Sequence, residues 1–151
     1  MLKKSLLPIV FSLVLAIVIP GIGSLNHLAV AQNQDNNGQA FIKDVSVKEA
    51  NELIQKYFKS GYLIILDVRT DSEYKSGHLE GAINIDYYSE NLETLLNKLD
   101  KTKPILVYCK SGARSRRTTS IMEGLGFKKI YNMEGGILDW EYKGLPTVKG
   151  K

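Results

Sequence analysis

Two short and almost uninterrupted apolar runs, at residues 62–68 and 105–108, constrain the fold of this chain most strongly. Runs of this length without polar alternation are typical of strands that are buried on both faces of a sheet. Segments with helical apolar spacing lie around them, at residues 46–59, 89–99 and 114–125. Because strands and helices alternate along the chain, we expect an α/β domain with a parallel sheet.

Capping signals mark where two of the helices begin. Ser46 is followed three residues later by Glu49, and Thr70 is followed in the same way by Glu73. In such a capping box the hydroxyl and the carboxylate bind backbone N–H groups that have no partner inside the helix. The second helix should be short and should stop at Gly77. The remaining segments are two short strands at residues 82–85 and 128–131 and a short helix at residues 137–142.

Cys109 is the only cysteine of the chain, and it directly follows the apolar run at residues 105–108. Ligands of open α/β sheets bind beyond the carboxyl ends of the strands, which is where this residue is expected to lie. A lone cysteine is either a reactive thiol or a small buried apolar residue, and the count alone does not distinguish the two. The count does exclude a disulfide within the chain.

The residues after Cys109 favour the reactive interpretation. A tight loop between a strand and a helix can turn successive backbone N–H groups inward and form a nest for an anion. Gly112 gives this loop conformational freedom, and Ala113 keeps it uncrowded. Lys110 and Arg114 add positive charge. Helix N-termini and nearby cations lower the pKa of a cysteine from about 8.5 to roughly 3.5–7.5, so we expect a thiolate.

Five pieces of the sequence, in their order along the chain, resemble the rhodanese family of sulfurtransferases. The pieces are residues 66–69 (LDVR), Glu73-Tyr74 with Gly77-His78, residues 81–85 (GAINI), residues 109–115 (CKSGARS), and residues 134–136 (EGG) with Trp140, Gly144 and Pro146. The resemblance extends over residues 41–146 and implies a rhodanese-like domain at residues 41–148. The fold that it implies is α/β, with a five-stranded parallel sheet and helices on both faces.

The resemblance also implies a chemistry. Members of the family move a sulfane sulfur from a small anionic donor, thiosulfate or another persulfide donor, to a thiophilic acceptor such as cyanide or a thiol. The sulfur would be held as a persulfide on Cys109, which is covalent catalysis without a metal or an organic cofactor. The substrate-binding residues that the resemblance implies are Arg69, Lys110, Ser111, Gly112, Ala113 and Arg114.

Other classes of function remain open. Related phosphatases of the dual-specificity cell-cycle type have an arginine six positions after the cysteine, but here Ser115 holds that position and Arg114 is one residue closer. The shorter loop favours a sulfur-centred group over a phosphoryl group. A non-catalytic binding module, or a persulfide carrier that passes sulfur to a protein partner, is a further alternative.

Ser111 stands where the best-known thiosulfate-using members have a basic residue, which argues against thiosulfate as the physiological donor.

Three further polar residues have structural interpretations. Asp67 is expected to hydrogen-bond a neighbouring loop, because it ends an apolar strand. His78 is expected to be structural, because a thiolate that its own loop activates needs no general base. Arg69 has two possible roles, contact with the substrate and pairing with Glu73, and the second does not exclude the first.

The overall charge gives no reason to expect a nucleic-acid partner. The chain has 20 basic and 16 acidic residues, and two of the lysines precede residue 5. The first 31 residues contain no acidic residue, so 18 basic residues face 16 acidic ones in the remainder. Such a balance lacks the basic excess of a nucleic-acid-binding domain.

The N-terminal segment is expected to be a signal peptide at residues 1–31. Two lysines precede an apolar run at residues 6–19, and the sequence AVA at 29–31 offers small residues to a signal peptidase. A polar, flexible linker follows at residues 32–40, so the domain is expected to be extracytoplasmic, either periplasmic or secreted. The alternative is an uncleaved membrane anchor, because residues 6–25 are about long enough to cross a bilayer.

Cleavage after Ala31 would leave Gln32 as the first residue of the exported protein. N-terminal sequencing of protein recovered outside the cytoplasm is expected to begin at this glutamine. Recovery of chains that still begin with Met1, in the membrane fraction, would instead support the anchor.

Overall fold

The computed structural model describes residues 40–150. Contacts within the chain separate Met1–Asn33 from Gln34–Lys151, and the described residues belong to the second unit. The predicted signal peptide and nearly all of the predicted linker therefore lie outside the described residues. Within residues 40–150, no helix has the length and apolar character that crossing a membrane requires.

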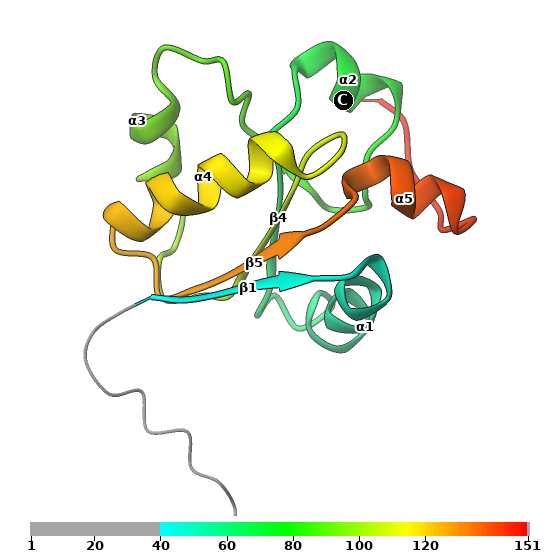
Figure 1. Ribbon diagram of the computed structural model, residues 1–151, viewed down its shortest axis with the longest axis horizontal. Coiled ribbons are helices and arrows are strands. Elements are labelled where there is room, and N and C mark those ends of the chain that lie inside the picture. The colour runs from blue at the N-terminus through cyan, green and yellow to red at the C-terminus, as the bar shows by residue number, and fades with distance from the viewer. Residues whose placement is uncertain (1–39, 151) are drawn as a thin grey trace, which may run out of the picture. The chain divides into compact units, whose positions relative to one another are not determined.

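The strands form one parallel sheet in the order β1-β5-β4-β2-β3, of which Figure 1 labels β1, β5 and β4. They are β1 (Phe41–Val45), β2 (Ile64–Asp67), β3 (Ile83–Asn84), β4 (Ile105–Tyr108) and β5 (Lys129–Met133). The helices are α1 (Val47–Tyr57), α2 (Asp71–Ser76), α3 (Leu92–Leu96), α4 (Ala113–Gly124) and α5 (Gly136–Tyr142). The predicted α/β fold with a five-stranded parallel sheet is confirmed.

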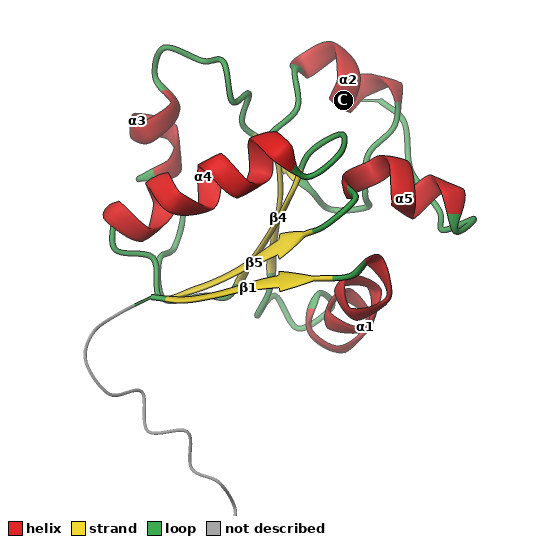
Figure 2. Cartoon of the chain, in the orientation of Figure 1, coloured by secondary structure: helices red, strands yellow, loops and turns green. Residues whose placement is uncertain are grey.

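Helices cover both faces of the sheet (Figure 2). On one face α1 and α5 pack against a buried cluster that includes Leu106 and Tyr108. On the other face α3 and α4 pack against a cluster that includes Val107 and Cys109. Strand β4 contributes to both clusters because successive side chains point to opposite faces, and all its residues are buried. Burial of each such apolar side chain stabilises the fold by about 1.5–3 kcal/mol. The core therefore fixes the position of Cys109, which directly follows β4.

Both predicted capping boxes are present. The Ser46 hydroxyl accepts a hydrogen bond from the Glu49 N–H at 3.3 Å, and the Glu49 carboxylate accepts one from the Ser46 N–H at 2.9 Å. Thr70 and Glu73 make the same two contacts at 3.3 and 3.0 Å. The second box fixes Glu73 in the first turn of α2.

Several elements are shorter than the sequence predicts. The structure has Ile64–Asp67 for the strand expected at 62–68, Ile83–Asn84 for the strand at 82–85, and Leu92–Leu96 for the helix at 89–99. Helix α3 has no side-chain cap at Asn91, and a tighter turn follows it, in which the Leu99 N–H donates to the Leu96 carbonyl at 3.0 Å. Tertiary packing still holds this segment, because Leu92 and Leu96 are buried.

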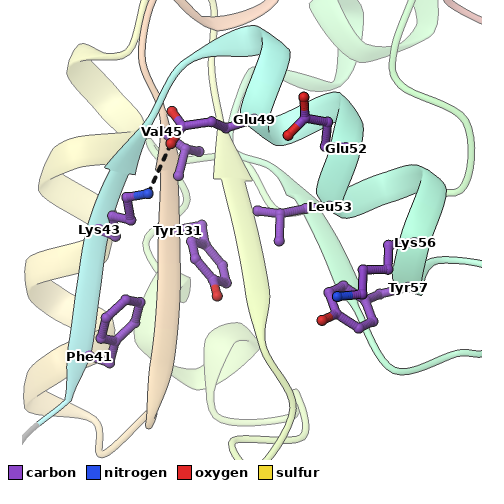
Figure 3. A pocket seen from close by; sticks show the side chains of 9 residues that line it. All are labelled: Phe41, Lys43, Val45, Glu49, Glu52, Leu53, Lys56, Tyr57 and Tyr131. Carbon is purple, nitrogen blue, oxygen red and sulfur yellow. Dashed lines mark hydrogen bonds and ion pairs between the residues drawn. The ribbon is translucent and has the colours of Figure 1, made fainter. Parts of the chain in front are cut away.

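Strand β1 is not predicted by the apolar pattern of the sequence. It is an edge strand that pairs only with β5, and Phe41 in it is 45% exposed. A groove of about 380 Å³ lies between β1, β5 and α1, and Phe41 and Tyr131 line it (Figure 3). Lys43 and Glu49, which also line it, form an ion pair at 2.9 Å. None of the residues 109–114 lines this groove, so it is separate from the cysteine loop.

We expect Tyr108→Phe to lower the free energy of unfolding by about 1–3 kcal/mol. The Tyr108 hydroxyl accepts a hydrogen bond from the Leu79 N–H at 3.1 Å, and both residues are buried. Its removal leaves a buried donor without an acceptor. Urea unfolding measures the change, with Tyr142→Phe as the control because Tyr142 is 89% exposed. Equal midpoints for Tyr108→Phe and the wild type would contradict this account.

Candidate active site

Cys109 lies directly after β4, and its Sγ is surrounded by hydrogen-bond donors. The Gly112 N–H donates to Sγ at 3.1 Å, and the Ser115 hydroxyl lies 3.6 Å from Sγ. The same hydroxyl lies 3.0 Å from the Gly112 carbonyl oxygen. A hydroxyl has one proton to donate, so ionisation of the thiol favours turning the O–H of Ser115 toward Sγ. Cys109 is only 1% exposed.

The loop curls because its outward carbonyl groups are bound elsewhere. The N–H groups of Ile137 and Leu138, in the first turn of α5, donate to the carbonyl oxygens of Cys109 and Lys110 at 2.9 and 3.1 Å. With these carbonyls turned outward, the N–H groups of the loop turn inward. The approach is so close that a Cβ on Gly136 would lie 2.6 Å from the Lys110 carbonyl. Glycine is therefore required at this position, where φ is also +59°.

Gly112 completes the curl. It has φ of 96° and is the residue immediately before α4, in a left-handed conformation that glycine adopts without a Cβ clash. The conformational freedom that the sequence predicted for Gly112 is therefore used for one left-handed turn. This conformation points its N–H at the sulfur and begins the helix at Ala113.

The hydrogen bonds lower the pKa of Cys109. Burial raises the pKa of this thiol, but hydrogen bonds from the N–H and hydroxyl of Ser115 and from the N–H groups of Ser111 and Gly112 outweigh that effect. The pKa therefore lies below the ordinary value of a cysteine. A thiolate is the nucleophilic form of a cysteine, so the loop both shields and activates it.

Arg114 belongs to the loop but is paired with an acidic residue. Its two terminal nitrogens bind the two carboxylate oxygens of Glu73, each at 2.8 Å. The hydrogen bond to Glu73 raises the pKa of Arg114 most, and the negative charges of Glu73 and of the Cys109 thiolate raise it further. The hydrogen bond from Arg114, with those from Thr70, lowers the pKa of Glu73 to about 2. Glu73 therefore holds the guanidinium in a fixed orientation and balances its charge.

Arg69 is buried, with its guanidinium carbon 5.7 Å from the ring centroid of Tyr108, the residue before Cys109. Its guanidinium binds the Asp67 carboxylate, with Nη2 2.6 Å from Oδ2, and donates to the Gly77 carbonyl at 2.6 Å. Asp67 also accepts the Arg69 backbone N–H at 2.9 Å, which gives it the structural role expected of it. Arg69 does not pair with Glu73, because Glu73 pairs with Arg114. Substrate contact by Arg69 stays a prediction.

The other predicted residues lie on the outer side of the loop. Lys110, Ser111 and Ala113 are exposed, and within residues 40–150 the Lys110 side chain forms no ion pair. His78 is structural: its ring stacks on Tyr74 at 3.7 Å, and its Nδ1 lies 2.9 Å from the Tyr74 carbonyl oxygen. Among the described residues, no three His, Cys, Asp or Glu side chains are grouped as a metal site would need.

Sequence reasoning did not assign roles to Ser115, Glu73 and Gly136 at this site. Ser115 was visible as the residue six positions after Cys109, directly after the loop, where a hydroxyl in the first turn of a helix can face the cysteine. Glu73 was expected to cap a helix and was a possible partner of Arg69, but its contact with Arg114 joins residues far apart in the chain. Gly136 approaches Lys110 closely only because β5 and α5 pack beside the loop, and no local pattern in the sequence indicates this contact.

The sequence profile of the rhodanese-like domain matches residues 46–143. The chain belongs to the rhodanese-like family. Thiosulfate sulfurtransferase 18 of Arabidopsis thaliana is 38% identical over 111 residues, which cover 66% of this chain and 78% of that protein. The chloroplastic rhodanese-like domain-containing protein 14 of the same plant is 30% identical over 149 residues, or 70% of this chain and 65% of that protein.

Among solved structures, the rhodanese-like chain resembles the polysulfide-sulfur transferase homodimer of Wolinella succinogenes. The TM-score is 0.58 at 33% identity, and the match covers 76% of this chain and 83% of that one. Bacterial tRNA uridine(34) hydroxylases also match, although the chain spans 48% or less of their length. The family thus includes sulfurtransferases, which act on sulfur donors and acceptors, together with proteins of other activities.

Ser115→Ala is expected to raise the pKa of the Cys109 thiol, because it removes a donor to the thiolate. Alkylation by iodoacetamide requires the thiolate, so its rate rises with pH through this pKa. The wild-type midpoint should lie below that of a free thiol, and the variant midpoint should lie higher. At pH 7 the variant should react about three- to tenfold more slowly, as the loss of one hydrogen bond implies.

Ser120→Ala is the matched control, since Ser120 is exposed on the same helix. Its alkylation profile should equal that of the wild type. If Ser115→Ala also gave the wild-type profile, the hydroxyl would have no part in activating the sulfur.

Proposed function

We propose that this rhodanese-like domain is a sulfurtransferase that carries a sulfane sulfur as a persulfide on Cys109. The observation that supports the proposal is the ring of donors around Sγ, from Ser111, Gly112 and Ser115, which favours an anionic sulfur. A persulfide is anionic at its outer sulfur, so the same donors suit the loaded state. The substrate site comprises the loop residues 110–114.

The reaction has two displacements at sulfur. In the first, the Cys109 thiolate attacks the outer sulfur of the donor, a new S–S bond forms, and the donor leaves with the electron pair of the broken bond. In the second, an acceptor nucleophile attacks the outer sulfur of the persulfide, and Cys109 leaves as a thiolate. The lowered pKa of Cys109 makes it a good leaving group in the second step.

We favour a persulfide or polysulfide donor over thiosulfate. The charge of Arg114 is balanced by Glu73, and the position two residues after Cys109 is Ser111. The loop therefore offers fewer free cations to a dianion such as thiosulfate than its sequence suggests. A relative named for polysulfide-sulfur transfer is consistent with this donor.

The loop argues against phosphoryl transfer. Arg114 would be the residue to bind a phosphoryl group, but Glu73 already occupies both of its terminal nitrogens. The guanidinium keeps three further N–H donors, but the Glu73 carboxylate balances the positive charge that would attract a phosphate.

We also propose that the domain works outside the cytoplasm. The support is the sequence of residues 1–31 alone, with its two lysines, its apolar run and its AVA site.

Incubation with inorganic polysulfide or thiosulfate is expected to add the mass of one sulfur atom to the wild-type protein. The Cys109→Ser variant should gain none, and cyanide should remove the added sulfur from the wild type as thiocyanate. Intact-mass spectrometry and a thiocyanate assay provide the two measurements. A mass gain that persists in Cys109→Ser would refute the assignment, and the absence of both signals with every donor would favour the binding-module alternative.

A further inference from the structure

We propose that Glu73 determines which sulfur donors react at Cys109, because its carboxylate balances the charge of Arg114 and so disfavours a doubly charged donor such as thiosulfate. The donors that it favours are persulfides of small uncharged thiols, which carry at most one negative charge. This inference rests on the proposed sulfur transfer and names its class of substrate. Glu73 acts through Arg114, so it is a positioning residue and not a catalytic one.

Arg114 lies between residues that bind the sulfur. It is the second residue of α4 and lies between Gly112, whose N–H donates to Cys109 Sγ at 3.1 Å, and Ser115, whose hydroxyl lies 3.6 Å from Sγ. The hydrogen bond to Glu73 raises the pKa of Arg114 most, and the negative charges of Glu73 and of the Cys109 thiolate raise it further. The guanidinium and the thiolate therefore interact, and an anion at the sulfur is subject to the same charge.

Glu73 balances the charge of Arg114 but leaves part of its hydrogen-bonding capacity. Each of the two carboxylate oxygens accepts a hydrogen bond from one terminal nitrogen of Arg114 at 2.8 Å. A guanidinium has five N–H donors, so three remain that this carboxylate does not occupy. Arg114 can thus orient a substrate by hydrogen bonds, while the pair as a whole adds no net positive charge.

The balance between the two side chains is permanent at neutral pH. The hydrogen bond from Arg114 lowers the pKa of Glu73 most, and hydrogen bonds from the Thr70 N–H and hydroxyl help to bring it to about 2. Glu73 therefore stays ionised. The side chains of Arg114 and Glu73 are only 15% and 29% exposed, so solvent screens the pair less than it screens a surface ion pair.

The other unpaired charges near the loop are of both signs and do not replace the charge that Glu73 balances. Within residues 40–150, the side chains that lack an ion pair here are positive at Lys110 and Arg117 and negative at Asp86, Glu90 and Asp139. All except the half-buried Asp86 are exposed to solvent, which screens them. They stay unchanged when Glu73 is substituted, so such a variant isolates one charge.

The two donor classes differ in how much negative charge they bring to the thiolate. With thiosulfate, the Cys109 thiolate attacks the outer sulfur, a new S–S bond forms, and sulfite leaves with the electron pair of the broken bond. With a persulfide RSSH, the thiolate attacks the sulfur that carries the proton, RS⁻ leaves with the electron pair, and the proton stays on the transferred sulfur. The first reaction assembles three negative charges and the second at most two, so the net charge at Arg114 matters more for thiosulfate.

Glu73→Gln removes the charge and can keep the helix cap. The amide oxygen of glutamine can take the position of Glu73 Oε2, which accepts the Thr70 N–H at 3.0 Å and Arg114 Nη1 at 2.8 Å. Glu49→Gln is the matched control. Glu49 also closes a capping box and pairs with a basic residue, at 2.9 Å, but it lines the groove that is separate from the cysteine loop.

The test compares reagents of different charge on the full-length protein. Iodoacetamide is uncharged and iodoacetate carries one negative charge, and both alkylate Cys109. In Glu73→Gln, the ratio of the iodoacetate rate to the iodoacetamide rate should rise about threefold, as for a partly screened charge. The loading rate with thiosulfate, followed by intact-mass spectrometry, should rise about tenfold, because the effect on two charges is the square of that on one. Loading by hydroxyethyl persulfide should change at most about threefold.

Two further measurements separate charge from shape. The double variant Glu73→Gln/Arg114→Gln has the same net charge as the wild type, so its iodoacetate-to-iodoacetamide ratio and its thiosulfate-to-persulfide ratio should both return to wild-type values. Raising the salt concentration from about 0.05 to 0.5 M should reduce the gain that Glu73→Gln gives. Structural damage to the loop would follow neither pattern.

The outcomes distinguish this inference from the proposed function. Unchanged ratios in Glu73→Gln, equal changes in Glu49→Gln, or a raised ratio that persists in the double variant would each show that the charge of Glu73 does not select donors. A wild type that no donor converts to a persulfide would overturn the proposed sulfur transfer. Alkylation needs no sulfur transfer, so its rate ratio would still decide whether Glu73 controls the access of anions to Cys109.

Discussion

Two hydrogen bonds from the start of α5, to the carbonyl oxygens of Cys109 and Lys110, are the constraint on which the rest of the site depends. They hold these oxygens away from the sulfur, and the loop N–H groups consequently converge on it. Without them, carbonyl dipoles could face the thiolate and destabilise it. Because α5 follows β5, the neighbour of β4, the sheet order itself brings these donors to the loop. The order of the strands in the sheet thus determines that N–H groups, and not carbonyl oxygens, face the sulfur.

The site stabilises negative charge with backbone groups more than with free cations. Three of the four arginines around it, Arg69, Arg114 and Arg116, are bound to carboxylates. Their role in the structure is to fix positions: Arg69 ties the end of β2 to the turn at Gly77, and Arg114 ties the loop to α2. Fixed dipoles need no reorganisation when a charge forms or leaves, which suits the proposed alternation of Cys109 between thiolate and persulfide.

The parts of the fold that local chemistry determines were predictable from the sequence. The buried strand at 105–108 and the capping boxes at Ser46 and Thr70 follow from apolar runs and from hydroxyl–carboxylate spacing, and the structure contains them. Strand β1 was missed as an individual element because an edge strand with exposed residues has no continuous apolar run. The partners of Arg69 and Arg114 were also missed, because ion pairs between distant segments depend on the final packing. Loop residues could be named from the sequence, but the direction of their N–H groups could not.

The single buried thiol has a consequence for the lifetime of the persulfide proposed to form on it. Many redox proteins clear a modified cysteine with a second, resolving cysteine of the same chain, but this sequence has only Cys109. A sulfur held there has no internal route of release, and bulk water and stray thiols reach it poorly because the residue is almost fully covered. Release then depends on arrival of an external nucleophile. In the proposed reaction, the sulfur would stay on Cys109 until an acceptor arrives, and turnover would be set by the rate of that encounter.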